Sequence, residues 1–135
     1  MSMSGLFVAM KTVLTADAPL LAVVPVNNIR PAEDPTAPAA GNLVYYGWAS
    51  GSWGDKRKRG EGVIRIAAGA VDNNVAAGSI LDLVRAALTA RKLSYTGGPV
   101  RVHLWQEESA FTDAGTTDSD RFLAATNYRV RWIAN

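Results

Sequence analysis

A run of four cationic side chains is the feature of this sequence best suited to bind another molecule. It occupies residues 56–59 and consists of Lys56, Arg57, Lys58 and Arg59. Adjacent like charges repel one another, so these side chains must project into water or meet an anion. Trp53 precedes the run, and Trp and Arg are typical interface anchors. The run therefore predicts a solvated loop tip, or a contact with the phosphates of DNA or with an acidic protein surface.

Side chains for catalysis are scarce. His103 is the single histidine. It alternates with Val102 and Leu104 and shares a side of the strand with Arg101 and Trp105, which predicts a position that faces solvent or a partner rather than a place in a catalytic triad. The segment 106–120 holds acids and no basic residue, which favours solvated carboxylates over an acid–base pair. The spacing fits neither a calcium loop nor a phosphate-binding glycine motif. We expect no enzymatic activity, no catalytic residue, no metal and no cofactor.

The composition excludes further classes of site. The chain has 135 residues, of which 48% are hydrophobic and 19% are charged, and it has no cysteine. Disulfides, thiol nucleophiles and cysteine-ligated zinc are therefore excluded. No apolar run approaches the roughly 20 residues that span a bilayer, so we expect no membrane contact. The formal charge of 14 − 12 = +2 excludes a bulk polycation, and the length predicts a single domain over residues 1–135.

The first elements expected to position these residues are helical. Apolar side chains recur on one helical face over residues 3–14: Leu6, Met10, Val13 and Leu14. Asp17 can cap a second, short helix over residues 20–24, with Pro19 in its first turn. Residues 25–42 contain four of the six prolines, which predicts an extended, turn-rich loop.

The remaining elements predict a sheet. Strands over residues 43–48 and 63–66 form an antiparallel hairpin, and the glycine-rich, basic loop 49–60 is its tip. A helix capped by Asp72, Asn73 or Asn74 runs to Lys92, and its start can lie as late as Ser79. Strands 100–105 and 122–133 follow, separated by an acidic loop over 106–120. This order favours an α+β domain with an antiparallel or mixed four-stranded sheet, packed on one face by two main helices.

Charge and alternation also predict subunit contacts. Residues 56–59 carry +4 and residues 106–120 carry −5, so identical subunits in a ring can pair head to tail. In the last strand, Trp132 belongs either to the core or to a subunit interface, while Arg129 and Arg131 form a polar face. The candidate interface residues are Arg129, Arg131, Trp132, Glu107 and Glu108.

Several short motifs follow one another along almost the whole chain. They are Ala-Pro-Leu-Leu-Ala at 18–22, a segment over 26–31 that ends in Arg30-Pro31, Leu-Val-Tyr-Tyr at 43–46, Ile-Leu-Asp-Leu-Val-Arg-Ala-Ala-Leu at 80–88, Asp-Ala-Gly at 113–115 and Tyr-Arg-Val-Arg-Trp at 128–132. In their order and spacing the chain resembles the small tail-completion or tail-terminator proteins of long-tailed bacteriophages and gene-transfer particles. The strongly basic hairpin tip departs from the pattern, since small polar tips are more usual in that family.

The resemblance implies a structural role in the virion. Family members cap the tail tube, usually as a hexameric ring, and present a surface to the head-side connector. The implied partners are further copies of the chain, the tail tube protein, the connector protein and, through Trp53 and residues 56–59, DNA in the channel. The implied location is the neck of the virion, after assembly in the host cytoplasm. Two alternatives remain: a head–tail connector or stopper protein, and a small nucleic-acid-binding module that uses residues 56–59.

Overall fold

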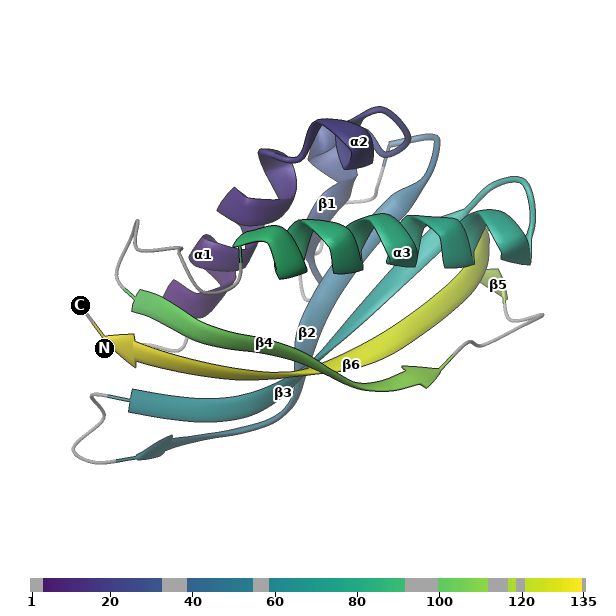
Figure 1. The fold of residues 1–135 in the computed structure, drawn as a ribbon. Helices are drawn as coiled ribbons and strands as arrows, with labels where there is room; N and C mark the ends of the chain where they lie inside the picture. The colour runs from purple at the N-terminus through teal and green to yellow at the C-terminus, as the bar shows by residue number, and fades with distance from the viewer. Residues whose placement is uncertain are drawn as a thin grey trace.

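The computed structural model describes residues 4–32, 39–54, 59–91, 100–111, 117–118 and 121–134. Figure 1 shows helices gathered on one side of a strongly twisted sheet, from which one hairpin extends. The elements are α1 (Ser4–Thr15), α2 (Ala18–Leu21), the 3₁₀ helix η1 (Val26–Asn28), β1 (Ile29–Pro31), β2 (Leu43–Gly54), β3 (Arg59–Ala70), α3 (Asn74–Arg91), β4 (Val100–Phe111), β5 (Thr117–Asp118) and β6 (Arg121–Ala134).

The sheet is mixed, and its four long strands are the four that the sequence predicts. The strand order is β1-β2-β3-β6-β4, and β5 pairs with β6 beside this path. Among the described strands, β1 and β2 pair in parallel and the other pairs are antiparallel. The predicted α+β class, with helices on one face, is confirmed. The short β1 and η1 were missed, because Pro25 and Pro31 favoured a continuous loop through this segment.

The predicted hairpin loop over residues 49–60 is wrong, because both strands continue into it. Their pairing runs from Leu43 opposite Gly69 to Gly54 opposite Arg59, with one register shift between Trp48 and Ser50. Pairing of β3 with β6 supports the hairpin along its whole second strand. These ladder hydrogen bonds outweigh the low strand propensity of the glycines, which is a weak and context-dependent preference. Lys56, Arg57 and Lys58 lie outside the described residues.

The predicted acidic loop over residues 106–120 is wrong in its first part. Strand β4 continues to Phe111 and pairs with β6, so that Glu107 lies opposite Tyr128. The short β5 then pairs with the start of β6, with Asp118 opposite Arg121. The physical reason is the length of β6. Because β6 is long enough to pair with them, residues whose polar sequence does not predict a strand become part of one.

Helices α2 and α3 begin at side-chain caps. The carboxylate of Asp17 accepts a hydrogen bond from the backbone N–H of Leu20 at 3.1 Å, as expected for the cap of α2. The predicted range of 20–24 is wrong, because this cap starts the helix at Ala18 and α2 ends at Leu21. The side chain of Asn73 accepts one from the N–H of Ala76 at 2.8 Å, and α3 begins at Asn74 rather than at Ser79. Gly78 therefore lies inside α3, where its weak helix propensity is overridden by the cap and by the buried face.

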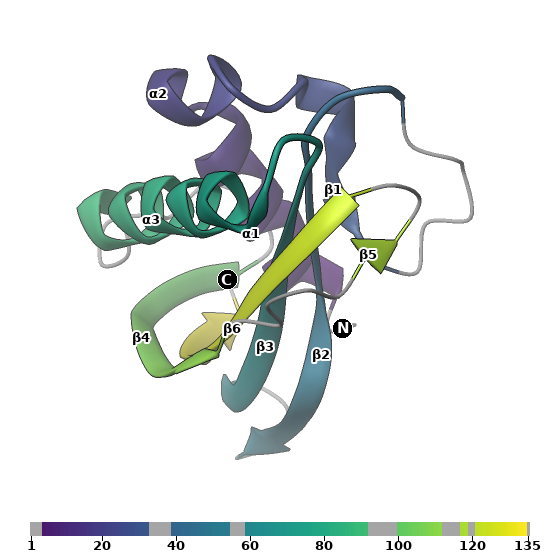
Figure 2. The ribbon, with the colours of Figure 1, turned by 90° about the vertical axis from the view of Figure 1, so that its right-hand side faces the viewer.

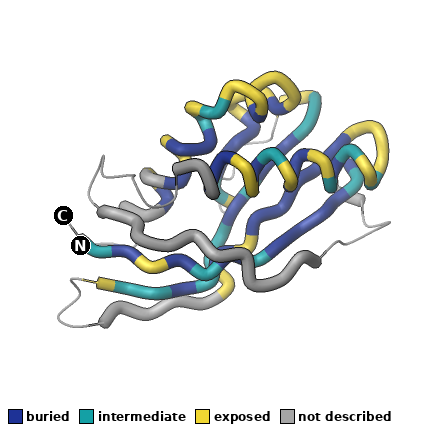
Figure 3. Tube along the Cα trace, viewed as in Figure 1, coloured by how far each residue is buried: buried dark blue, intermediate teal, exposed yellow. Residues whose placement is uncertain are grey.

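An aromatic cluster joins α1 to the sheet. The ring of Phe7 lies 5.3 Å from that of Tyr46 and 5.4 Å from that of Trp48, and Trp48 lies 5.4 Å from Trp132. Trp132 is 1% exposed, so of the two positions that the sequence left open for it, the core is the one observed. Figure 3 shows the buried residues along the sheet beneath the helices. Trp132 is therefore corrected as an interface candidate, because its ring already packs inside its own chain.

Candidate functional site

The side of the sheet that faces away from the helices carries most of the charge of β3 and β6. Side chains alternate between the two faces of a strand. Ile64 and Ile66 are buried beneath the helices, whereas Arg65 between them is exposed. We call the opposite side the outer face and define it by eight residues of these two strands. They are Arg59, Glu61, Val63, Arg65, Asn127, Arg129, Arg131 and Ile133.

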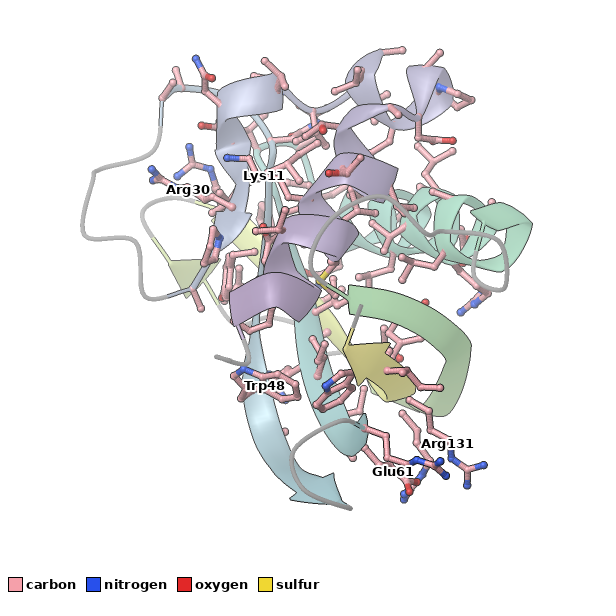
Figure 4. The ribbon with its side chains drawn as sticks, turned by 90° about the vertical axis from the view of Figure 1, so that its left-hand side faces the viewer. Lys11, Arg30, Trp48, Glu61 and Arg131 are labelled. Carbon is pink, nitrogen blue, oxygen red and sulfur yellow. The ribbon has the colours of Figure 1, made fainter. Side chains whose placement is uncertain are left out.

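Glu61 lies at the centre of this face and contacts two arginines of the neighbouring strand. Its Oε1 accepts a hydrogen bond from Nη1 of Arg129 at 2.7 Å, and Nε of Arg131 lies 3.5 Å from the same oxygen. In the sheet Glu61 is directly opposite Arg131, so the shorter contact to Arg129 is diagonal. Figure 4 shows Glu61 and Arg131 side by side, far from Lys11 of α1. The carboxylate therefore holds two guanidinium groups over one region of the face.

The electrostatics of Glu61 follow from these contacts. The hydrogen bond from Arg129 holds the pKa of the carboxyl below its ordinary value of 4.5, against an opposing effect of desolvation, and the charges of Arg131 and Arg129 lower it further. Glu61 is therefore ionised at neutral pH. Both ion pairs are solvent-accessible, with 38% of the Arg129 side chain, 59% of Arg131 and 39% of Glu61 exposed. Such pairs stabilise a fold only weakly, so their main effect is to position charge.

The outer face holds two further arginines on β3. Arg59 and Arg65 are exposed on β3, on the same face as Arg129 and Arg131 of β6. The eight residues that define the face hold four guanidinium groups and one carboxylate, a net charge of +3. The face therefore reaches Arg59, the last residue of the predicted basic run.

The structure brings together some of the residues predicted from sequence and leaves others apart. Arg129 and Arg131 both contact Glu61. Glu61 was not predicted from sequence, because its position beside these arginines depends on the register of β3 and β6. Arg59 begins β3 opposite Ile133. Trp53 lies in β2 opposite Gly60, and Glu107 and Glu108 belong to β4. The contacts of these last three side chains lie outside the described part of the chain.

A side-chain hydrogen-bond pair lies at the β3–α3 turn. The side chain of Asn42 donates a hydrogen bond to the carbonyl of Val23 at 2.9 Å and accepts one from the N–H of Val71 at 3.1 Å. It thereby links the backbone of Val23 to that of Val71, and the side chains of these two residues are 42% and 48% exposed. Figure 2 shows this turn and α2 on the helix side, with β5 on the opposite side of the sheet.

The described residues include no group that suits metal chemistry. No cluster of three or more His, Asp or Glu side chains that could hold a metal ion occurs within them. Over the same residues, no helix has both the length and the apolar character needed to cross a membrane. The arrangement that the described residues do offer is a charged sheet face, which suits binding.

Comparison with known proteins shows a fold likeness. No protein-family model matches the chain, and no curated protein sequence matches it. Among solved structures, the gp17 protein of bacteriophage SPP1 is similar, with a TM-score of 0.53 and 18% sequence identity. The likeness covers 97% of this chain and 89% of that one. It therefore extends over the helices and the sheet together.

Proposed function

We propose that this protein is a structural component of a phage virion that caps the tail tube as a ring and docks to the head-side connector. The observation that carries the proposal is the fold likeness to a bacteriophage protein over nearly the whole chain. The motifs over residues 18–46, 80–88 and 113–132 support it independently, because they resemble the tail-terminator family in order and spacing. Low identity makes the fold, and not individual residues, the basis of the proposal.

The architecture supports a role in assembly. The β2–β3 hairpin extends beyond the helix-covered part of the sheet (Figure 1), and it leads to residues 56–59. In the proposed ring, Trp53 and this basic tip contact a neighbouring ring or the DNA in the channel. The ring is a homo-oligomer, proposed as a hexamer, and its partners are the tail tube protein and the connector. Its location is the neck of the virion.

The proposal is tested in the virus whose genome carries the gene. A nonsense mutation is expected to give filled heads without attached tails, together with tails of irregular length, as seen by negative-stain electron microscopy. Wild-type protein supplied from a plasmid restores normal particles. A variant with Lys56, Arg57, Lys58 and Arg59 all replaced by serine is expected to restore tail length less well than an Arg85→Ser control on α3.

A second measurement concerns the ring itself. Light scattering on a sizing column is expected to detect a closed oligomer at high protein concentration or on addition of purified tubes. Normal particles from the nonsense mutant would refute the structural role. Two other outcomes would assign the chain to another part of the neck. One is particles with normal tails and heads that lack DNA, and the other is particles in which the protein lies at the connector rather than on the tail tube.

A further inference from the structure

Strand β2 is paired on both sides over only part of its length. Strand β1 lies beside it from Val44 to Tyr46. Ala32 extends this cover by one step, because its N–H donates to the carbonyl of Tyr46 at 2.7 Å and a Cβ on Gly47 would lie 3.3 Å from the Cβ of Ala32. Among the described strands, the rest of β2 pairs only with β3. Residues 48–54 therefore form an edge of the sheet.

This edge lacks most of the features that usually protect one. Edge strands are shielded from other chains by charged side chains, by proline or by irregular pairing. The sequence of residues 48–54 is Trp-Ala-Ser-Gly-Ser-Trp-Gly, with no charged residue and no proline. Its one register shift lies at the beginning, between Trp48 and Ser50, and the pairing with β3 is regular from Ser50 to Gly54. Glycine inside a strand also permits the close approach of another backbone, so this edge is suited to accept a further strand.

Strand β4 forms the opposite edge of the same part of the sheet. Figure 1 shows β2 and β4 on the two sides of β3 and β6 at the hairpin end. One row of directly opposite residues crosses all four strands, from Ser52 through Glu61 and Arg131 to Leu104. Each of the three strand pairs is antiparallel, so β2 and β4 run in opposite directions. A second copy placed beside β2 in the same orientation therefore presents its β4 in the antiparallel sense, which is the more stable pairing.

The charges of the two edges favour pairing of β4 with β2 over pairing of β4 with itself. Strand β4 carries Arg101, Glu107 and Glu108, and its pairing with β6 shifts register twice. Contact between the glutamates of two β4 strands brings like charges together, which destabilises a strand pair. Residues 48–54 carry no charge and meet these side chains without such repulsion. Both halves of the contact belong to one chain, and head-to-tail contacts of this kind close into rings when the rotation between copies permits it.

We propose that residues 48–54 of β2 accept strand β4 of a second copy of this chain, so that antiparallel strand pairing joins neighbouring subunits. The inference rests on the proposed ring and identifies the surfaces that hold it together. It concerns the backbone of residues 48–54, and it is separate from the contacts proposed above for the side chain of Trp53 and for residues 56–59.

The first test uses the absence of cysteine from the chain, which makes an introduced cysteine the single thiol. Two full-length variants, Ser52→Cys and Leu104→Cys, are mixed under conditions in which light scattering detects the oligomer, with purified tail tubes if these are required. A flexible bismaleimide is then added, and an affinity tag on one variant identifies the products. Because the two positions lie in one row of the sheet, a crosslink between the two different variants is expected.

Two control reactions accompany this experiment. Ser79→Cys on α3, mixed with Leu104→Cys, is expected to give no crosslink between the variants. Each variant alone is expected to give little product. Crosslinks within Ser52→Cys alone would indicate pairing of β2 with itself and would overturn the inference. An oligomer without a crosslink between Ser52→Cys and Leu104→Cys would also overturn it and would leave the proposed function standing, whereas the absence of any oligomer would refute the ring and the inference together.

A second test adds a charge to the edge. In Ser52→Lys the new side chain lies on the edge strand, where lysine hinders strand addition, and directly opposite Glu61, with which it forms a favourable cross-strand pair. The expected result is a several-fold rise in the protein concentration needed for assembly, measured by light scattering, with an unchanged circular dichroism spectrum. Ser79→Lys is the matched control, because Ser79 is exposed on α3 and should leave assembly unchanged. An equal effect of the two substitutions would overturn the inference.

Discussion

Asn28 and Arg121 donate hydrogen bonds to the same backbone oxygen, the carbonyl of Ala39, at 3.0 and 2.7 Å. Asn28 also donates to the carbonyl of Asn42 and accepts from the N–H of Ala39, and Arg121 also donates to the carbonyl of Gly41. Both side chains are buried, at 0% and 6% exposure. The segment 39–42 therefore links η1 to the beginning of β6 through hydrogen bonds from buried side chains.

Asn28→Ala should destabilise the protein by about 2–4 kcal/mol, because three hydrogen bonds are lost and the groups left behind are buried. The measurement is urea unfolding, with a lower midpoint and an unchanged slope. The neighbouring Asn27→Ala is the control, since Asn27 is exposed and a surface substitution should change stability by less than about 0.5 kcal/mol. Equal midpoints for the two variants would contradict the proposed link.

Glu61→Gln should lower stability at pH 7 by an amount that disappears on acidification. The folded pKa of Glu61 lies below its ordinary value of 4.5, so the ionised carboxylate stabilises the fold above about that pH. This stabilisation is lost as the pH falls through the folded pKa. The measurement is the difference in urea midpoint between wild type and variant from pH 7 to pH 3. A difference independent of pH would show that the pair with Arg129 does not act through charge.

Two glycines should respond to alanine in opposite directions. Gly78→Ala lies inside α3 with no atom within 4 Å of the added Cβ, so it should stabilise the protein by about 0.5–1 kcal/mol. Gly41→Ala must adopt a φ of +105°, which should cost about 1–3 kcal/mol. Thermal and urea unfolding of both variants give the comparison. Stabilisation by both substitutions would show that residue 41 changes its backbone conformation freely.

Trp132→Ala should destabilise the protein by about 3–5 kcal/mol, because it opens a cavity beside Trp48 in the core. Arg131→Ala, on the opposite side of the same strand, should cost less than about 1 kcal/mol because its ion pair is exposed. Near-ultraviolet circular dichroism should show the loss of the packed indole pair in the first variant alone. A stable Trp132→Ala monomer would mean that the ring contributes little to the core.

Sequence reasoning succeeded where local chemistry determines structure. Asp17 and Asn73 cap helices by hydrogen bonds within one turn, so their role is visible from neighbouring residues alone. Alternation in 122–133 likewise placed Tyr128, Val130 and Trp132 on one face. The full lengths of β2, β3 and β4 could not be predicted, because polar and glycine-rich residues such as 49–54 become strands only through partners distant in sequence.

The candidate site was predicted in part. Arg129 and Arg131 were identified as one polar face of a strand, and that pattern depends only on alternation. Glu61 and Arg65 were not identified, because their position on the same face depends on the antiparallel register between β3 and β6. Residues 56–58 and the side chains of Glu107 and Glu108 fall outside the described residues, so their roles stay predictions.

Strand β4 has a further consequence for solubility. Among the described strands it pairs only with β6, so it is an edge strand of the sheet. Such edges promote aggregation unless charge or irregularity interrupts them. Two register shifts, between Val102 and Leu104 and between Glu107 and Ser109, interrupt β4, and adjacent glutamates accompany the second. These features disfavour indiscriminate strand addition to β4.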